Sequence, residues 1–123
     1  MITLREYLVQ KRDALIRRRE EPRGPRTLEA TVTAEGRSGV RRIRIRDFQV
    51  VSDSPADFAG YDLGPGSPEL QLGVLGSCLT HVFLIQAADL EIPLDAVHVR
   101  VQGDLDGRAR QEGFEHIPVY PHN

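Results

Sequence analysis

The residue of this 123-residue chain best suited to covalent chemistry is its single cysteine, Cys78. An ionised thiol is a strong nucleophile, but a free cysteine is only a few per cent thiolate near neutral pH, so a cation must activate it. His81 lies three residues further on, on the same face of a helix, and could orient or polarise the sulfur. Two interpretations stay open: an activated nucleophile, or a small buried hydrophobic residue.

Other kinds of site have less support in the sequence. His81, His98, His116 and His122 lack the spacing of zinc ligands, and one cysteine cannot build a multi-cysteine cluster. No glycine-rich phosphate loop with a following lysine is present. The arginines at 17–19 and at 42, 44 and 46 have no stacking aromatic residues among them, so we expect solvated faces or protein contacts rather than nucleic acid. We therefore predict no metal and no nucleic-acid partner.

The segment that carries Cys78 is predicted to be a helix of about 20 residues. Ser67 is a candidate N-cap, Pro68 suits the first helical position, and Glu69 favours the positive end of the helix. Apolar residues surround the helix axis, so we expect the helix to be buried on most sides as the core of the fold. Polar residues interrupt the apolar run and argue against a membrane span: Gln71, Ser77, Thr80, His81 and Gln86.

The elements before this helix have clear sequence signals. Residues 3–19 predict a helix with a capping box formed by Thr3 and Glu6. Its narrow apolar stripe predicts docking on another surface, such as that of a partner subunit. Residues 27–34 and 40–46 alternate as the two strands of a hairpin, which continues through residues 48–51. Residues 52–67 read as a loop in which Phe58 and Tyr61 either line a pocket or pin the loop to the core.

Two more strands are expected after the helix. Residues 97–102 alternate between valine and polar residues, and residues 114–120 suggest a short edge strand limited by Pro118. The expected fold is therefore α+β: an antiparallel sheet, made of the N-terminal hairpin and meander plus these later strands, packed on a long buried central helix.

Composition limits the class of protein. The length fits one domain, and 40% apolar with 28% charged residues is typical of a soluble globular protein. The lone cysteine and the lack of a secretory signal pattern favour the cytoplasm. The net charge of −2 hides a basic first part, +7 over residues 1–46, and an acidic remainder, −9 over residues 47–123. These parts could bind each other within one fold or across a dimer.

Several stretches resemble the family of osmotically inducible and organic hydroperoxide resistance proteins (OsmC/Ohr): Ser67 to Leu70, Leu75 to Leu79, Ile92 to Asp95 and Val97 to Asp106. The resemblance covers residues 27–120. It implies a single OsmC-like domain over residues 1–123, with residues 1–21 as an N-terminal docking helix and without the family's C-terminal helix and strand. It also implies an intertwined homodimer with a thiol peroxidase site at the subunit interface.

The resemblance assigns roles to individual residues. Cys78 matches the peroxidatic cysteine, and Arg37 is similar in position to the arginine that stabilises its thiolate. The carboxylate that completes the family's site falls on Pro68, and the adjacent Glu69 points about 100° away around the helix.

No second cysteine is present to resolve a sulfenic acid, so an external thiol reductant is expected in a one-cysteine cycle, with no cofactor. The function implied is reduction of organic hydroperoxides by a cytoplasmic homodimer without membrane or nucleic-acid partners. The alternative is a catalytically inactive binding or stress-response protein that keeps the fold and merely packs Cys78.

Overall fold

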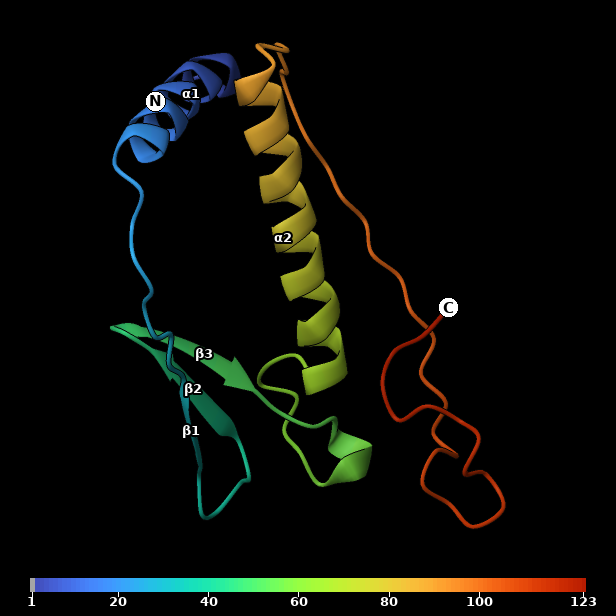
Figure 1. Cartoon of the computed structure of the whole chain (residues 1–123). Helices are drawn as coiled ribbons and strands as arrows, with labels where there is room; N and C mark the ends of the chain where they lie inside the picture. The colour runs from blue at the N-terminus through green and yellow to red at the C-terminus, as the bar shows by residue number, and fades with distance from the viewer. Residues whose placement is uncertain (1) are drawn as a thin grey trace. The chain divides into compact units, whose positions relative to one another are not determined.

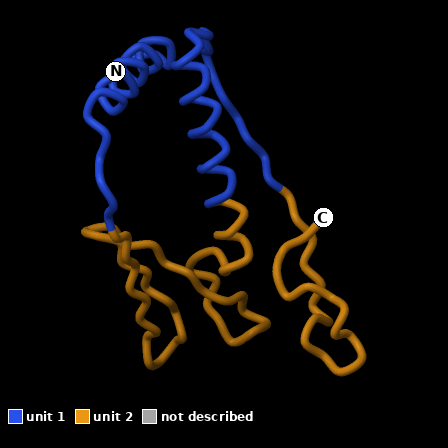
Figure 2. The backbone as a smooth tube through the Cα atoms, viewed as in Figure 1, with its two compact units in different colours: residues 1–26, 74–101 blue, residues 27–73, 102–123 orange. Residues whose placement is uncertain are grey.

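The computed structural model describes residues 2–123 and contains two helices and one three-stranded sheet (Figure 1). The elements are α1 (Leu4–Glu20), β1 (Thr31–Ala34), β2 (Arg41–Ile45), β3 (Phe48–Ser52), a short 3₁₀ helix (Ala56–Phe58) and α2 (Ser67–Asp89). They confirm the α+β class. The chain divides into two compact units: residues 1–26 with 74–101, and residues 27–73 with 102–123 (Figure 2).

Helix α1 begins with the predicted capping box. The hydroxyl of Thr3 accepts a hydrogen bond from the backbone N–H of Glu6 at 3.2 Å, and the carboxylate of Glu6 accepts one from the backbone N–H of Thr3 at 3.0 Å. Two of the N–H groups that a helix start leaves without intrahelical partners are thereby satisfied. Arg17, Arg18 and Arg19 lie in the last turn, where the helix dipole favours positive charge.

Within the first unit, α1 docks on the C-terminal end of α2. Leu8 packs with Ala87 and Ala88, all three nearly excluded from solvent, and four half-buried residues surround them: Tyr7, Leu15, Leu84 and Leu94. In this structure the surface that α1 contacts belongs to the same chain. The apolar stripe is short, which is why this core is small.

Charge pairs surround the same contact. The guanidinium of Arg5 donates to both carboxylate oxygens of Asp95, at 2.6 and 3.2 Å, and these hydrogen bonds and the positive charge lower the pKa of Asp95. Arg12 and Arg19 form ion pairs with Glu91 and Asp89 at 3.3 and 2.8 Å. The basic N-terminal part therefore binds acidic residues of the later part within one unit.

The sheet of the second unit is an antiparallel meander in the order β1, β2, β3. Val32 pairs with Ile43, and Ile43 pairs with Val50, so apolar residues share one face as the alternation predicts. Gly39 ends the β1–β2 turn with φ of +71°, a conformation that glycine adopts without steric cost. This apolar face remains partly open in the single chain, with Val32 and Phe48 more than half exposed.

The loop between β3 and α2 is organised around Asp53, whose side chain is almost fully buried. Its carboxylate accepts hydrogen bonds from the backbone N–H groups of Ser54, Tyr61 and Leu63 at 2.7, 3.0 and 3.2 Å. Burial opposes the charged form, but these hydrogen bonds and the charge of Arg41 outweigh it, so the pKa of Asp53 lies below its usual value. The loop is therefore an ordered structure.

We expect Gly60→Ala to destabilise this loop strongly. A Cβ atom at Gly60 would overlap the backbone carbonyl of Ser54, which cannot move away as a flexible side chain could. Overpacking of this kind costs about 1–3 kcal/mol. Urea denaturation followed by circular dichroism measures the loss. Gly36→Ala is the matched control, because a Cβ there meets nothing within 4 Å, and equal effects of the two substitutions would contradict the prediction.

The structure corrects two expectations for the rest of the chain. Helix α2 was expected to be buried on most sides, yet in the single chain its only buried residues are Ala87 and Ala88. Residues 97–102 and 114–120 were expected to be strands, but neither forms one; a single bridge, between Asp104 and His122, is found nearby. Residues 97–101 are extended and have no neighbouring strand to supply the hydrogen bonds that a sheet requires.

Candidate functional site

Cys78 lies near the middle of α2 with its side chain exposed. Of the two interpretations of Cys78, the small buried residue does not describe the single chain, in which α2 as a whole is exposed. Residues one turn away on a helix are its surface neighbours, and for Cys78 these are Val74, Leu75, His81 and Val82. The three apolar neighbours are about half exposed or more. The thiol therefore lies in an exposed apolar patch, which we call the Cys78 patch, defined by these five residues.

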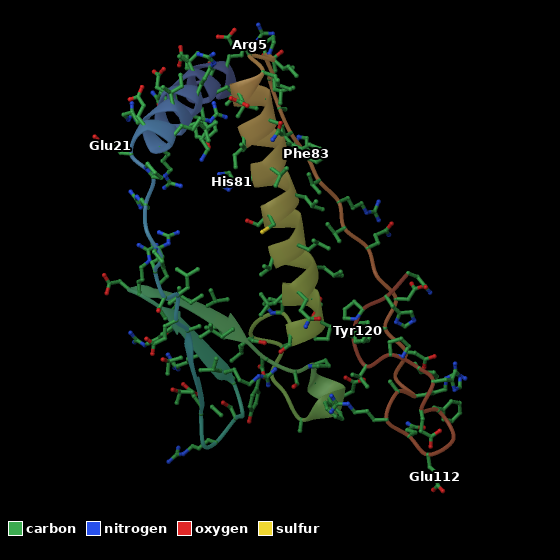
Figure 3. The ribbon with its side chains drawn as sticks, viewed as in Figure 1. Arg5, Glu21, His81, Phe83, Glu112 and Tyr120 are labelled. Carbon is green, nitrogen blue, oxygen red and sulfur yellow. The ribbon has the colours of Figure 1, made fainter. Side chains whose placement is uncertain are left out.

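His81 is the polar member of the Cys78 patch, and α1 supplies its partner. Lys11 Nζ lies 2.8 Å from His81 Nε2. Figure 3 shows His81 projecting from α2 toward α1, whereas Phe83 projects from the other side of the helix. A lysine ammonium has three donors and no acceptor, so in this contact Lys11 donates and Nε2 of His81 accepts. A positive charge is thus fixed to a side chain one turn from the thiol.

The extended segment 97–101 approaches α2 at Gly76. A Cβ atom on Gly76 would lie 3.3 Å from Val101 Cγ2, so the absence of a side chain permits this close approach. Thr80 turns its hydroxyl inward along the helix and donates to the carbonyl of Gly76 at 2.7 Å. Gly73, by contrast, has open space where a Cβ would stand. Val101 thus covers the helix at Gly76, whereas nothing in the described chain covers the backbone at Gly73.

Glu69 lies at the start of α2 and caps it. The helix begins at Ser67, and the backbone N–H of Leu70 donates to the carbonyl of Gly66, so the cap is one residue earlier than the predicted Ser67. The Glu69 carboxylate accepts a hydrogen bond from the backbone N–H of Gly66 at 3.0 Å. This is half of a capping box, and it holds the side chain against its own helix.

Arg37 lies exposed in the β1–β2 turn of the second unit, whereas Cys78 belongs to the first unit. Other arginines of the hairpin have contacts of their own. The Arg42 guanidinium donates to Glu35 at 2.6 Å, and the Arg46 guanidinium lies 5.0 Å from the centre of the Phe48 ring. Arg41 contacts Ser52 and Ser54 beside the Asp53 loop.

The first unit also contains an apolar cleft of about 300 Å³ between α1 and the end of α2. Leu8, Val9, Ala87, Ala88, Ile92 and Pro93 form its apolar lining, with Arg5, Arg12, Asp13 and Glu91 at its polar positions. The charges on these four residues cancel, and two of them form the Arg12–Glu91 ion pair. The cleft therefore favours a ligand without net charge.

Lys11 is the site residue that sequence reasoning missed, although the sequence contained a signal. Leu4, Leu8 and Leu15 form the stripe by which α1 docks, and Lys11 occupies the helical position between Leu8 and Leu15 on that stripe. A lysine in the docking stripe of a helix must meet the element on which the helix packs. Asp53 was missed for a different reason, because its three partners are backbone groups that leave no pattern in the sequence.

One helix of the described chain, Ser67–Asp89, is long and apolar enough by length and composition to cross a membrane. Core helices of soluble proteins meet the same criterion of length and composition. Across residues 2–123 no three histidine, cysteine or acidic side chains gather as a metal site would require.

The chain matches no known protein family, no curated protein and no solved structure.

Proposed function

We propose that this chain is a thiol-dependent peroxidase that reduces organic hydroperoxides through Cys78 and works as a cytoplasmic homodimer. The observation that carries the proposal is the position of the thiol: it is exposed, at the centre of an apolar helix face. A peroxide can reach an exposed sulfur, and apolar neighbours favour the alkyl group of an organic hydroperoxide over hydrogen peroxide. The resemblance to the OsmC/Ohr family motivates the choice of reaction.

The reaction begins with attack of the Cys78 thiolate on the oxygen of the hydroperoxide that bears hydrogen. The O–O bond breaks, the sulfur is oxidised to a sulfenic acid, and the leaving alkoxide takes up a proton to become an alcohol. A first molecule of an external thiol then condenses with the sulfenic acid, releasing water and forming a mixed disulfide. A second thiol molecule displaces Cys78 and leaves as the oxidised disulfide. Arg37 is the group that we assign to stabilise the thiolate in the dimer, and Glu69 would act there only by leaving its cap.

The same face of α2 supports the proposed homodimer. A helix that is apolar on all sides is stable when other protein surfaces cover it, and α2 is covered in the single chain only around Ala87 and Ala88. We assign a second copy of α2 as the occupant of this face, because the polar residues within α2 and the Lys11–His81 contact are poorly suited to lipid.

Mass spectrometry after one equivalent of an organic hydroperoxide tests the chemistry. We expect one oxygen atom to be added at Cys78, and a nucleophilic probe selective for sulfenic acid to label the same residue. Added thiol should then restore the unmodified mass. A Cys78 that remains unmodified while a known thiol peroxidase in the same solution is oxidised would leave the alternative, a non-catalytic binding protein.

A further inference from the structure

We propose that the cleft between α1 and the end of α2 binds a small uncharged molecule that has an apolar body and one oxygen acceptor. The observation that carries this proposal is the Nε–H group of Arg12, a residue that lines the cleft. Across residues 2–123 it is the one buried side-chain nitrogen or oxygen without a hydrogen-bond partner. Such atoms are rare in folded proteins, and each calls for a physical explanation.

The apolar part of the cleft is formed within the first unit, to which all of its lining residues belong. Leu8 packs on Ala87 and Ala88, and because alanine side chains fill little space, a volume of about 300 Å³ remains beside this contact. Val9 and Ile92 also line the volume and are 62% and 48% exposed. Transfer of this apolar surface out of water favours the binding of an apolar ligand.

The Arg12 guanidinium forms the polar end of the site. Oε1 of Glu91 lies 3.3 Å from Arg12 Nε and forms an ion pair with it, but the oxygen is not placed to accept the hydrogen bond. A buried N–H group without an acceptor is costly, because it has lost its contact with water and gained no partner in exchange. An oxygen atom of a ligand in the cleft would supply the missing acceptor.

Charge and size narrow the class of ligand. Arg5 donates to both carboxylate oxygens of Asp95, and Arg12 is paired with Glu91, so the cations of the cleft are already neutralised. A dry cavity of about 150 Å³ holds one benzene ring, so about 300 Å³ accommodates a body of about two rings. The ligand class is therefore a two-ring or equally bulky ketone, ester or ether, and not a carboxylate or a phosphate.

The cleft is distinct from the Cys78 patch. Ala87 and Cys78 are about 14 Å apart along the axis of α2 at the standard helical rise. None of the described residues that line the cleft belongs to the Cys78 patch. Binding at the cleft requires neither a peroxide nor a thiol, so failure of this proposal and failure of the peroxidase proposal are separate results.

Nuclear magnetic resonance of the full ¹⁵N-labelled chain tests the site with two matched probes. 1-Tetralone and tetralin have the same two-ring carbon skeleton, and only 1-tetralone has a carbonyl oxygen. We expect 1-tetralone to shift the backbone resonances of Val9 and Ile92 and to move the Arg12 Nε–H proton downfield, as a new hydrogen bond does. Tetralin should shift the same backbone resonances without this downfield movement.

Substitutions separate the hydrogen bond from the apolar contact. Arg12→Met should weaken the binding of 1-tetralone by about two- to tenfold, the net effect of losing one hydrogen bond, and should leave the dissociation constant of tetralin within about twofold. Arg5→Met is the matched control, because Arg5 also lines the cleft but its donors already bind Asp95. It should change both constants equally. Val9→Trp, which fills the cleft from an exposed position, should weaken both probes on the order of tenfold.

Three results would each overturn the proposal. In the first, Arg12→Met changes the binding of both probes equally. In the second, 1-tetralone up to its solubility limit shifts resonances of the Cys78 patch, or none, instead of those of the cleft. In the third, the cleft resonances move with protein concentration and not with 1-tetralone, which would make a second copy of the chain the occupant. Spectra without probe check the fold of each variant, and the Nε–H shift of the wild type decides if Arg12→Met does not fold.

Discussion

Cys78→Ser is expected to abolish peroxidase turnover, with the rate of organic hydroperoxide reduction falling at least about a thousandfold, to the uncatalysed background. A serine hydroxyl at this position stays protonated and is a poor nucleophile toward the O–O bond, whereas its size is close to that of the thiol. Because Cys78 is exposed on α2, the substitution removes no buried packing from the single chain. Turnover is measured with a small thiol as the reductant.

Ser77→Ala controls for disturbance of the helix. Ser77 is the preceding residue and is also exposed, so its substitution tests the same part of α2 without touching the sulfur. We expect its turnover to stay within a few fold of the wild type. Binding of an apolar fluorescent ligand separates the two functional classes. If the protein is only a binding protein, the Cys78→Ser variant still binds the ligand, and the wild type shows no thiol-dependent turnover. That pair of results would refute the peroxidase proposal.

The part of the fold that local sequence signals determine was predictable. The capping box of Thr3 and Glu6 is a local pattern with a specific spacing, and it is found in the structure. The hairpin is predicted by alternation on either side of a glycine-containing turn, and its strands pair from Ala34 with Arg41 to Thr31 with Arg44. The first strand begins at Thr31 and not at residue 27, where the alternation begins. These signals succeed because both partners of each contact lie within a few residues of each other.

Contacts between distant segments were the part that sequence reasoning could not supply. The alternation of Val97, Val99 and Val101 predicts a strand, but the pattern does not say whether a neighbouring strand is available, and Val101 lies instead against Gly76 of α2. The same limit applies to the site. The types of Cys78 and His81 and their spacing were evident, whereas the contact between Lys11 and His81 joins residues 70 positions apart.

Val74→Glu is expected to convert the proposed dimer into monomers. Val74 belongs to the Cys78 patch and is 64% exposed in the single chain, so a charged side chain is tolerated there unless another surface covers it. Burying one valine contributes about 1.5–3 kcal/mol, and a twofold interface contains the residue twice. The dissociation constant should therefore increase by about 10²- to 10⁴-fold, as measured by sedimentation velocity over a range of concentrations. Hydroperoxide turnover should fall with the dimer fraction.

The matched control is Val9→Glu, since Val9 is 62% exposed and places the same change on α1 instead of on the Cys78 patch. A dimer that uses α2 should survive Val9→Glu and dissociate in Val74→Glu. A membrane is the competing occupant, because α2 has the length and composition to span one. Two results together would refute the dimer. The wild-type protein would stay monomeric in solution and sediment with lipid vesicles, and the Val74→Glu variant would no longer sediment with them. Sedimentation unaffected by vesicles, together with a concentration-dependent dimer, would establish the second copy as the partner of this face.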